Sequence, residues 1–450
     1  MSLRRLLGLS AAASGRFLQR HRSLSAAASA SGRFLSTAAA SHPPPWAMVE
    51  RLSMAYPLAE VRLAEPPLPS ELILPTDLVN TSDEPDPDGD VEQLLGGNVS
   101  SSSGAGGLLL LTYTDNRMAC PVIAQQGDTK VRYRTHKRVE GHAPDVTYLI
   151  CNPLSGQVLR LPNVRGTTKI FREHGMGILT QSGRGHGLPD RFAVAQLYTG
   201  NTMVRFLSDT GSWDVALGAP GRRVSPGVQR LVGTVDQETL AFGERLWWVD
   251  VGRGATSADP FSDYTETRFV ALPKASVLPP TDYHHDEAKK ARFSLRKYRR
   301  MGVSEGRLRY AEVSQQEPFV LSYFALVDEE GSGWTLEHRV ALSRLWADGG
   351  HPWLPLQGNK TPTIAVLDPL NANVVHLIVG DHVVGVDMRM EKVIGSYPHT
   401  IHGALGFLPC VLPPWLRSSQ IPSTGNRSST SAYLTDYSNI IFKKGRNFFD

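Results

Sequence analysis

Short apolar or alternating runs, each ended by Asp, Asn, Pro or Gly, recur along most of this chain of 450 residues. Typical runs are Gly107–Tyr113, Phe192–Tyr198, Leu246–Val251 and Val374–Val379. Such runs, bounded by turn formers, are typical of β-strands, whereas apolar residues spaced at i, i+3 and i+4 are scarce here. The sequence therefore predicts a mostly β protein. Helix candidates are confined to residues 286–298 and 337–346, and the second is equally typical of a strand followed by a turn.

A turn pattern repeats between these runs. Asn152, Asp259 and Asp368 each precede a proline at the end of a predicted strand, at intervals of 107 and 109 residues. Between them, Trp213 and Trp334 each follow a Gly-containing tight turn and begin a strand. The residue before a proline is pushed to extended geometry and proline donates no ladder hydrogen bond, so an Asx-Pro pair ends a strand.

Strand, turn and strand repeated at long intervals are typical of four-stranded propeller blades, and two blades of ~40–50 residues fit each interval. We therefore predict an all-β, β-propeller-like fold of short antiparallel strands, preceded by a disordered N-terminal leader. A pair of β-sandwiches is the alternative. The number of blades and the oligomeric state do not follow from the sequence.

Composition divides the chain into four predicted segments. They are a targeting leader (1–46), a Pro-rich and then acidic and Ser/Gly-rich lead-in that is partly disordered (47–106), the propeller-like domain (107–415), and a Ser/Thr-rich C-terminal tail (416–450). Runs rich in Pro, Gly and Ser are typical of loops rather than of packed elements.

Residues 1–46 contain six arginines and no lysine, aspartate or glutamate. As a helix, the segment would set Leu and Phe against Arg on opposite faces, which suits an import receptor and an anionic membrane surface. It resembles a mitochondrial presequence, and a chloroplast address is the alternative. Processing is expected between Leu35 and Ser36, with the bond before Ser25 as a second candidate.

Without the leader the chain is nearly neutral, with 41 basic and 43 acidic residues. A near-neutral body gives no electrostatic argument for nucleic acid as the main partner. No uninterrupted apolar stretch reaches the ~18 residues of a membrane-spanning helix. The three cysteines, Cys120, Cys151 and Cys410, form no C-x-x-C motif, which argues against a zinc ribbon and favours a reducing compartment.

The stretch LWWVDVGRG contains the residues most suggestive of a site. Trp247 and Trp248 are consecutive, so their side chains point to opposite faces of a strand and both are buried if each face is covered. Asp250 then accepts turn amides, Gly252 or Gly254 supplies a positive φ, and Arg253 lies in solvent at the tip. Because neither a P-loop nor a dinucleotide fingerprint is present, a strand and its turn are favoured over a phosphate-binding loop.

A basic run of seven residues surrounds two aromatic residues near the middle of the chain: Lys289, Lys290, Arg292, Arg296, Lys297, Arg299 and Arg300. The run is an RNA-binding or nuclear-import candidate. We favour a structural crossing between blades whose arginines pair with acids, since clustered charge is usually a solvated face.

Two other groups are weaker candidates. Residues 174–187 are rich in glycine and are interpreted as an inter-strand loop rather than a ligand site. His284, His285, His399 and His402 lack a metal-binding spacing and are interpreted as surface residues. The sequence thus predicts no catalytic, cofactor-binding or metal-binding residue.

Three stretches, LWWVDVGRGATSADPF, YRRMGVSEGRLRYAEV and GWTLEHRVALSRLW, resemble the plant family known as domain of unknown function 1618, which is expanded in grasses. The resemblance covers about residues 146–398 and implies kinship with the propeller segments that follow F-box motifs. It implies a fold but no activity, and residues 47–106 show no F-box helix pattern.

These observations predict an organellar, non-catalytic propeller scaffold that binds a protein partner, with no membrane span and no cofactor. Two alternatives stay open: a propeller hydrolase or lyase with its site at the channel mouth, and an organellar RNA-binding protein that uses residues 289–300.

Overall fold

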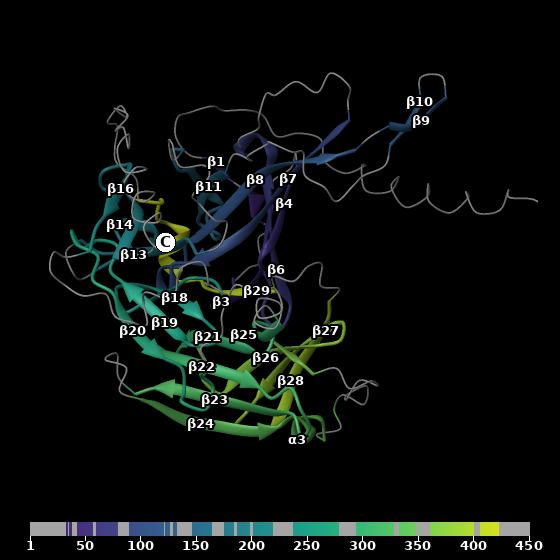
Figure 1. Cartoon of the computed structure of the whole chain (residues 1–450), viewed down its shortest axis with the longest axis vertical. Helices are drawn as coiled ribbons and strands as arrows, with labels where there is room; N and C mark the ends of the chain where they lie inside the picture. The colour runs from purple at the N-terminus through teal and green to yellow at the C-terminus, as the bar shows by residue number, and fades with distance from the viewer. Residues whose placement is uncertain are drawn as a thin grey trace, which may run out of the picture. The chain divides into compact units, whose positions relative to one another are not determined.

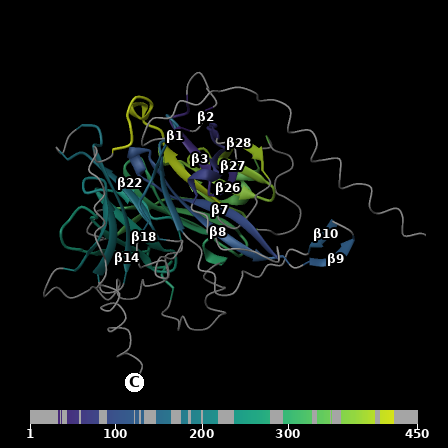
Figure 2. The ribbon, with the colours of Figure 1, turned by 90° about the horizontal axis from the view of Figure 1, so that it is seen from above.

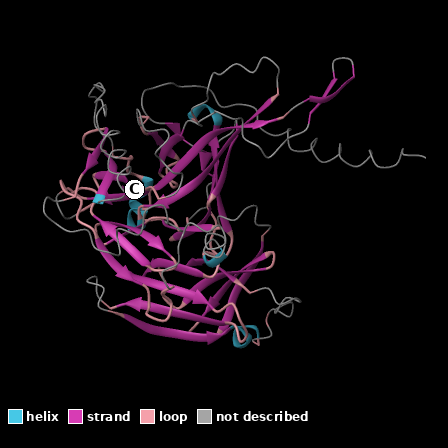
Figure 3. Cartoon of the chain, viewed as in Figure 1, coloured by secondary structure: helices cyan, strands magenta, loops and turns pink. Residues whose placement is uncertain are grey.

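The computed structural model describes residues 33–34, 36–37, 43–56, 60–79, 90–120, 122–126, 129–132, 146–163, 175–183, 187–198, 201–218, 237–278, 294–327, 333–347, 350, 361–399 and 406–422. Strands dominate this part of the chain (Figure 3), and helix is represented mainly by α3 (Leu342–Trp346) and short 3-10 turns. Among these residues, no helix is long and apolar enough to span a bilayer. The predicted all-β class is confirmed.

Four blades are four-stranded antiparallel sheets whose strands are consecutive in the chain. Blade 3 consists of β13 (Gly177–Gln181), β14 (Arg191–Tyr198), β15 (Thr202–Leu207) and β16 (Ser212–Ala216). Blade 4 consists of β17 (Leu240–Phe242), β18 (Arg245–Asp250), β19 (Gly254–Ala258) and β20 (Arg268–Ala271). Blade 5 consists of β21 (Arg299–Ser304), β22 (Arg307–Val313), β23 (Val320–Leu326) and β24 (Trp334–Ala341). Blade 6 consists of β25 (Thr363–Leu367), β26 (Val374–Val379), β27 (His382–Asp387) and β28 (Lys392–Pro398).

The other two blades contain the N-terminal strands. Blade 2 is formed by β7 (Val91–Ser102), β8 (Leu109–Ala119), β11 (Val146–Cys151) and β12 (Gln157–Arg160). Blade 1 is formed by β29 (Phe407–Val411), β3 (Trp46–Glu50), β6 (Pro69–Pro75) and β5 (Glu60–Arg62). Strand β4 (Leu52–Tyr56) pairs with both β6 and β7 and so joins blades 1 and 2 in one sheet. Three short pairings complete the strands: β1 (Arg33–Phe34) on β12, β2 (Ser36–Thr37) on β5, and β9 (Val122–Gln126) with β10 (Thr129–Arg132).

The first strand of each blade lies at the centre of the ring. Each inner strand contacts the inner strand of the next blade, in the order β7, β13, β17, β21, β25 and β29. Strand β29 in turn contacts β7, so the six blades form a closed propeller (Figures 1 and 2). The ring closes through an antiparallel ladder between β29 and β3, in which Pro409 is opposite Met48. Strands from the two ends of the described chain therefore share blade 1.

The hydrophobic core lies between blades. Trp247 and Trp248 are each 1% exposed and occupy different clusters. Trp247 packs with Met301 and Tyr310 of blade 5, whereas Trp248 packs with Leu179 of blade 3. A blade is covered on both faces by its neighbours, so consecutive strand residues can both be large and apolar.

The predicted start of the folded body at residue 107 is too late. Strands β3 to β7 precede it, and β7 is an inner strand. Its Gly and Ser residues are typical of a loop in sequence, but they suit the crowded centre of the ring. A Cβ on Gly97 would lie 2.5 Å from the carbonyl oxygen of Thr112. The hydroxyl of Ser101 accepts a hydrogen bond from the amide of Ile178 in blade 3 at 3.1 Å.

The predicted end at residue 415 is too early, because Leu416 and Ile421 are buried in the cluster between blades 2 and 3. The helix candidate at 337–346 is the end of β24 followed by α3. Residues 286–293 of the other helix candidate lie outside the described residues.

The three Asx-Pro pairs form the expected turns. The side-chain oxygens of Asn152, Asp259 and Asp368 each accept a hydrogen bond from the amide two residues later, at 2.8–3.1 Å. Asn152 and Asp259 follow the third strands of blades 2 and 4, so their interval of 107 residues does correspond to two blades. Asp368 follows the first strand of blade 6, so the second interval is not a repeat of the first. The matching position in blade 6 follows β27 and has no proline.

Candidate functional site

The two arginines that end the basic run, Arg299 and Arg300, are part of the propeller core. Arg299 donates to the carbonyls of Val251 at 3.1 Å and Ser276 at 2.8 Å. Arg300 is 8% exposed and pairs with Glu238. The structure also describes Arg296 and Lys297, whereas Lys289, Lys290 and Arg292 lie outside the described residues. The run therefore does not form one continuous described patch.

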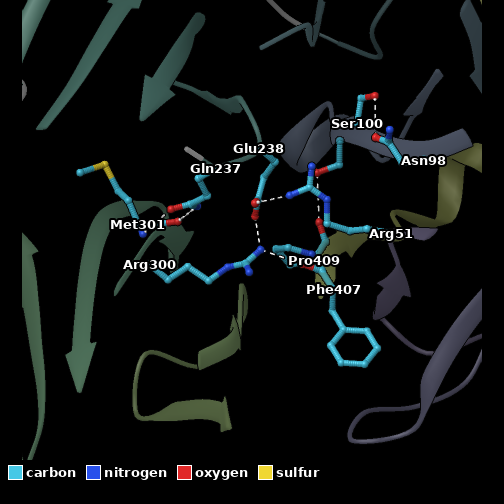
Figure 4. A network of polar contacts seen from close by, with 10 residues as sticks. Arg51, Asn98, Ser100, Gln237, Glu238, Arg300, Met301, Phe407 and Pro409 are labelled. Carbon is cyan, nitrogen blue, oxygen red and sulfur yellow. Dashed lines mark hydrogen bonds and ion pairs between the residues drawn. The ribbon is translucent and has the colours of Figure 1, made fainter. Parts of the chain in front are cut away.

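A buried ion network crosses the centre of the ring (Figure 4). Glu238, just before β17 of blade 4, is 4% exposed and pairs through one carboxylate oxygen with Arg51 of blade 1 at 3.2 Å. Its other oxygen pairs with Arg300 of blade 5. Arg300 also donates to the carbonyl of Phe407 in β29 at 2.8 Å. The network thus links opposite sides of the ring.

Two arginines share one glutamate in this network, and both neighbours of Arg51 affect its pKa. Burial lowers the pKa of Arg51, the Glu238 carboxylate opposes this shift, and Arg300 adds to it as a like charge. Arginine nevertheless stays charged in proteins. Removing Glu238 would leave two buried guanidinium groups without their counter-ion, and breaking a buried pair in this way typically costs about 3–5 kcal/mol, about the same as a large core truncation. Nothing in the sequence marks Arg51 or Glu238, because their meeting depends on ring closure.

A cavity of about 800 Å³ opens at the end of the ring where the first and second strands of the blades are connected. All six blades contribute lining residues. Blades 2 to 4 contribute Ala105 after β7, Leu179 and Leu188, and the segment Glu238–Glu244. Blades 5 and 6 contribute Val303, Glu305 and Leu370, the closure strand β29 contributes Leu408, and Trp415 lines the cavity beyond that strand. Its volume is within the usual 300–1,000 Å³ of ligand sites.

The described cavity walls are mainly apolar, and three glutamates are the charged groups among their residues. Glu238 is committed to Arg51 and Arg300, whereas Glu244 and Glu305 are exposed at the turns of neighbouring blades. The hydroxyl of Thr239, a residue only 1% exposed, has no hydrogen-bond partner among the described residues. The described lining contains no Lys, Arg or His.

The glycine-rich stretch 174–187, interpreted from the sequence as a loop, instead contains β13 and part of the cavity wall. Leu179–Ser182 and Gly187 line the cavity, while His174 and residues 184–186 lie outside the described residues. Of the histidine candidates, the structure describes His399, which packs on Phe407, and His284, His285 and His402 lie outside. No cluster of three or more metal-ligating side chains occurs in the described part.

The Gly252–Gly254 turn matches the expected architecture except at Arg253. Asp250 accepts the amide of Gly252 at 2.9 Å. Gly254 has the positive φ, 157°, and a Cβ there would lie 2.1 Å from the carbonyl oxygen of Val270. Arg253 is half-buried rather than solvated, because the chain near residues 272–278 packs over the turn through hydrogen bonds to the carbonyls of Gly252 and Arg253.

The two turn tryptophans connect neighbouring blades. The indole of Trp213 in β16 donates to the carbonyl of Pro162, just after β12, at 2.8 Å. The indole of Trp334 in β24 donates to the carbonyl of Ala271, at the end of β20, at 2.7 Å. Each bond therefore joins the outer strand of one blade to that of the preceding blade. The sequence indicated the turns but not these contacts.

Comparison with known proteins supports the family resemblance over part of the chain. A family model described as "Protein of unknown function (DUF1618)" matches residues 248–376, which include blade 5 and parts of blades 4 and 6. Among curated proteins, none matches the chain significantly.

The solved structures that this chain matches are only remotely similar to it. AztD from Citrobacter koseri is 12% identical, with 71% of this chain and 74% of that chain covered and a TM-score of 0.27. The β-propeller domain of Cps50 (Swd1) from Myceliophteria thermophila is 10% identical, with 68% and 88% covered and a TM-score of 0.26. At these values the comparisons add no functional argument.

Proposed function

We propose that the protein is a non-catalytic β-propeller interaction module that binds a protein partner at the channel-mouth cavity. The observation that carries this proposal is the cavity itself, which all six blades line with mainly apolar side chains. Concave, mainly apolar pockets with a few polar groups are usual ligand sites, and a short segment of a partner protein can offer the matching apolar and polar groups.

The carboxylate of Glu238 is not available for hydrolysis or elimination. A general base needs an available carboxylate oxygen within reach of the substrate proton. Both oxygens of Glu238 are instead engaged by arginines, one from blade 1 and one from blade 5. The carboxylate of Glu238 therefore serves the ring structure rather than proton transfer, and a hydrolase or lyase at the channel mouth stays the alternative function.

Blocking the cavity tests the proposal. Ala105 is exposed and lines the cavity, so Ala105→Trp should obstruct the mouth without entering the core. We expect the tagged full-length variant to lose the partners that co-purify with the wild type. Ala347→Trp, at an exposed alanine that ends α3 outside the cavity lining, is the matched control. Quantitative mass spectrometry showing the same partners for Ala105→Trp and wild type would overturn the proposal.

We further propose that residues 1–46 direct the chain into mitochondria, with a chloroplast as the alternative destination. The basis is the acid-free, arginine-containing composition of the segment. A fluorescent fusion of residues 1–50 should enter mitochondria and be cut near Leu35–Ser36. A fusion in which the six arginines are replaced by glutamine should stay in the cytosol. Diffuse signal from an uncut wild-type fusion would contradict this assignment.

A further inference from the structure

Among the described residues that line the cavity mouth, the charges have one sign. Glu244 lies in the turn between β17 and β18, and Glu305 in the turn between β21 and β22 of the next blade. Both are exposed, and neither carboxylate forms an ion pair or hydrogen bond with a described residue. Arg245, which follows Glu244, is directed elsewhere by bonds to Ser257 and to the carbonyl of Glu266.

Apolar side chains lie between the acidic mouth and the floor. Leu188 and Leu370 are 57% and 46% exposed at the cavity. Leu240, Phe242 and Trp415 continue the wall. A ligand that matches this cavity therefore has apolar groups within the cavity and positive charge at the cavity mouth.

A buried polar group without a described partner lies in the cavity lining. Thr239 is 1% exposed, and its hydroxyl makes no hydrogen bond to a described residue. Its methyl side is directed at Gly177, where a Cβ would lie 2.5 Å from Cγ2. A buried polar atom without a partner is unfavourable for the fold.

We propose that the cavity binds a peptide segment of the partner that combines apolar side chains with flanking lysine or arginine. This inference rests on the proposed function and specifies the chemistry of its ligand. The apolar side chains occupy the space between Leu240, Phe242 and Trp415, and the basic side chains pair with Glu244 and Glu305. Phosphate-bearing ligands, including RNA, meet like charge at Glu244 and Glu305.

The test uses the full-length protein and three pools of short fluorescein-labelled peptides. The first pool has Leu or Phe at central positions and Lys or Arg at the flanks. The second has Glu at the flanks, and the third has Ser at the centre. We expect the first pool to bind in fluorescence anisotropy and the other two to bind at least about tenfold more weakly. Binding of the first pool should weaken as salt rises, because exposed charge pairs are screened.

Charge removal at the mouth provides the residue-level test. The double variant Glu244→Gln, Glu305→Gln should weaken binding of the first pool by about five- to tenfold, as expected for two exposed ion pairs. Glu391→Gln is the matched control, because Glu391 is also a turn glutamate with positive φ (51°, against 57° and 46°) but does not line the cavity. Circular dichroism and thermal unfolding verify that each variant is folded.

The outcomes separate this inference from the proposed function. Equal binding of the basic and acidic pools, or no effect of the double variant, overturns the charge assignment. If Ala105→Trp still releases the cellular partners, the interaction module stands and only its ligand chemistry is wrong. If neither the partners nor any pool depends on the cavity, the proposed function fails as well.

Discussion

Trp247 and Trp248 pack into different parts of the core because consecutive side chains of a strand point to opposite faces. Their side chains point to opposite faces of β18 and enter separate cores on the two sides of blade 4. Their indoles also donate to different carbonyls, those of Phe242 and Gly175, at 3.0 and 2.6 Å. Burial of a tryptophan is favourable only when its N–H has a partner, and here both conditions are met.

His376 in β26 is buried without the hydrogen bonds that the two tryptophans make to described residues. It is 3% exposed, and neither ring nitrogen has a hydrogen-bond partner among the described residues. Its ring packs edge-on against Trp46 of blade 1, with 5.5 Å between centroids. Burial lowers the pKa of His376 from 6.5 to about 4.

This shift predicts a loss of stability in acid. The imidazole is neutral in the folded protein above pH about 4, whereas in the unfolded chain it gains a proton below about 6.5. Its contribution is therefore complete above pH 6.5 and declines as the pH falls towards 4, by on the order of 2 kcal/mol at pH ~5. Urea unfolding of the wild type and His376→Phe at pH ~7.5 and ~5 should show a smaller acid loss in the variant. Equal acid losses would contradict the assignment.

At the scale of elements, the same Asx-Pro turn serves two different purposes. Asp259 accepts the amide of Phe261 at 2.8 Å and so stabilises its own turn. Asn152 does the same for Leu154, but its amide nitrogen also donates to the carbonyls of Leu416 and Ser419, at 2.8 and 3.2 Å. Asn152 therefore ties the segment after β29 to blade 2, next to the cavity wall formed by Trp415.

Exchanging the two side chains tests this difference. Asn152→Asp keeps the turn acceptor but places a carboxylate against two carbonyl oxygens in a site that is 1% exposed. We expect a cost of about 2–4 kcal/mol in the free energy of unfolding, because a buried charge is left unpaired. Asp259→Asn, which has no such second contact, should change stability by less than about 0.5 kcal/mol. Similar costs for both variants in urea unfolding would show that residue 152 does not hold the C-terminal segment.

At the scale of the whole molecule, ring closure creates both the ion network and the cavity. The pairing of β29 with β3 brings Arg51 to Glu238, a residue 187 positions away in the sequence. It also places Leu408 and Trp415 next to loops from the other five blades. No single blade contains the cavity, which is a property of the assembled ring.

The sequence was most informative about the positions of strands and turns and least informative about which strands pack together. The runs around Phe192 and Leu246 lie in strands, and the turns at residues 152, 213, 259 and 334 all lead from the third strand of a blade to the fourth. The inner strand β7 was missed, because its Gly and Ser residues have the composition of a loop. In the folded ring Gly97 instead packs closely against Thr112 of β8, and Ser101 bonds to Ile178 of blade 3.

Local chemistry in the sequence was sufficient to determine strand alternation, turn positions and the all-β class, because these depend on residues within a few positions of one another. The number of blades, the closure by β29, the pairing of Arg51 and Arg300 with Glu238, and the acidic, apolar cavity were decided only by tertiary structure. Each depends on contacts between residues far apart in the chain, and no spacing or composition specifies which distant strands become neighbours when the ring closes.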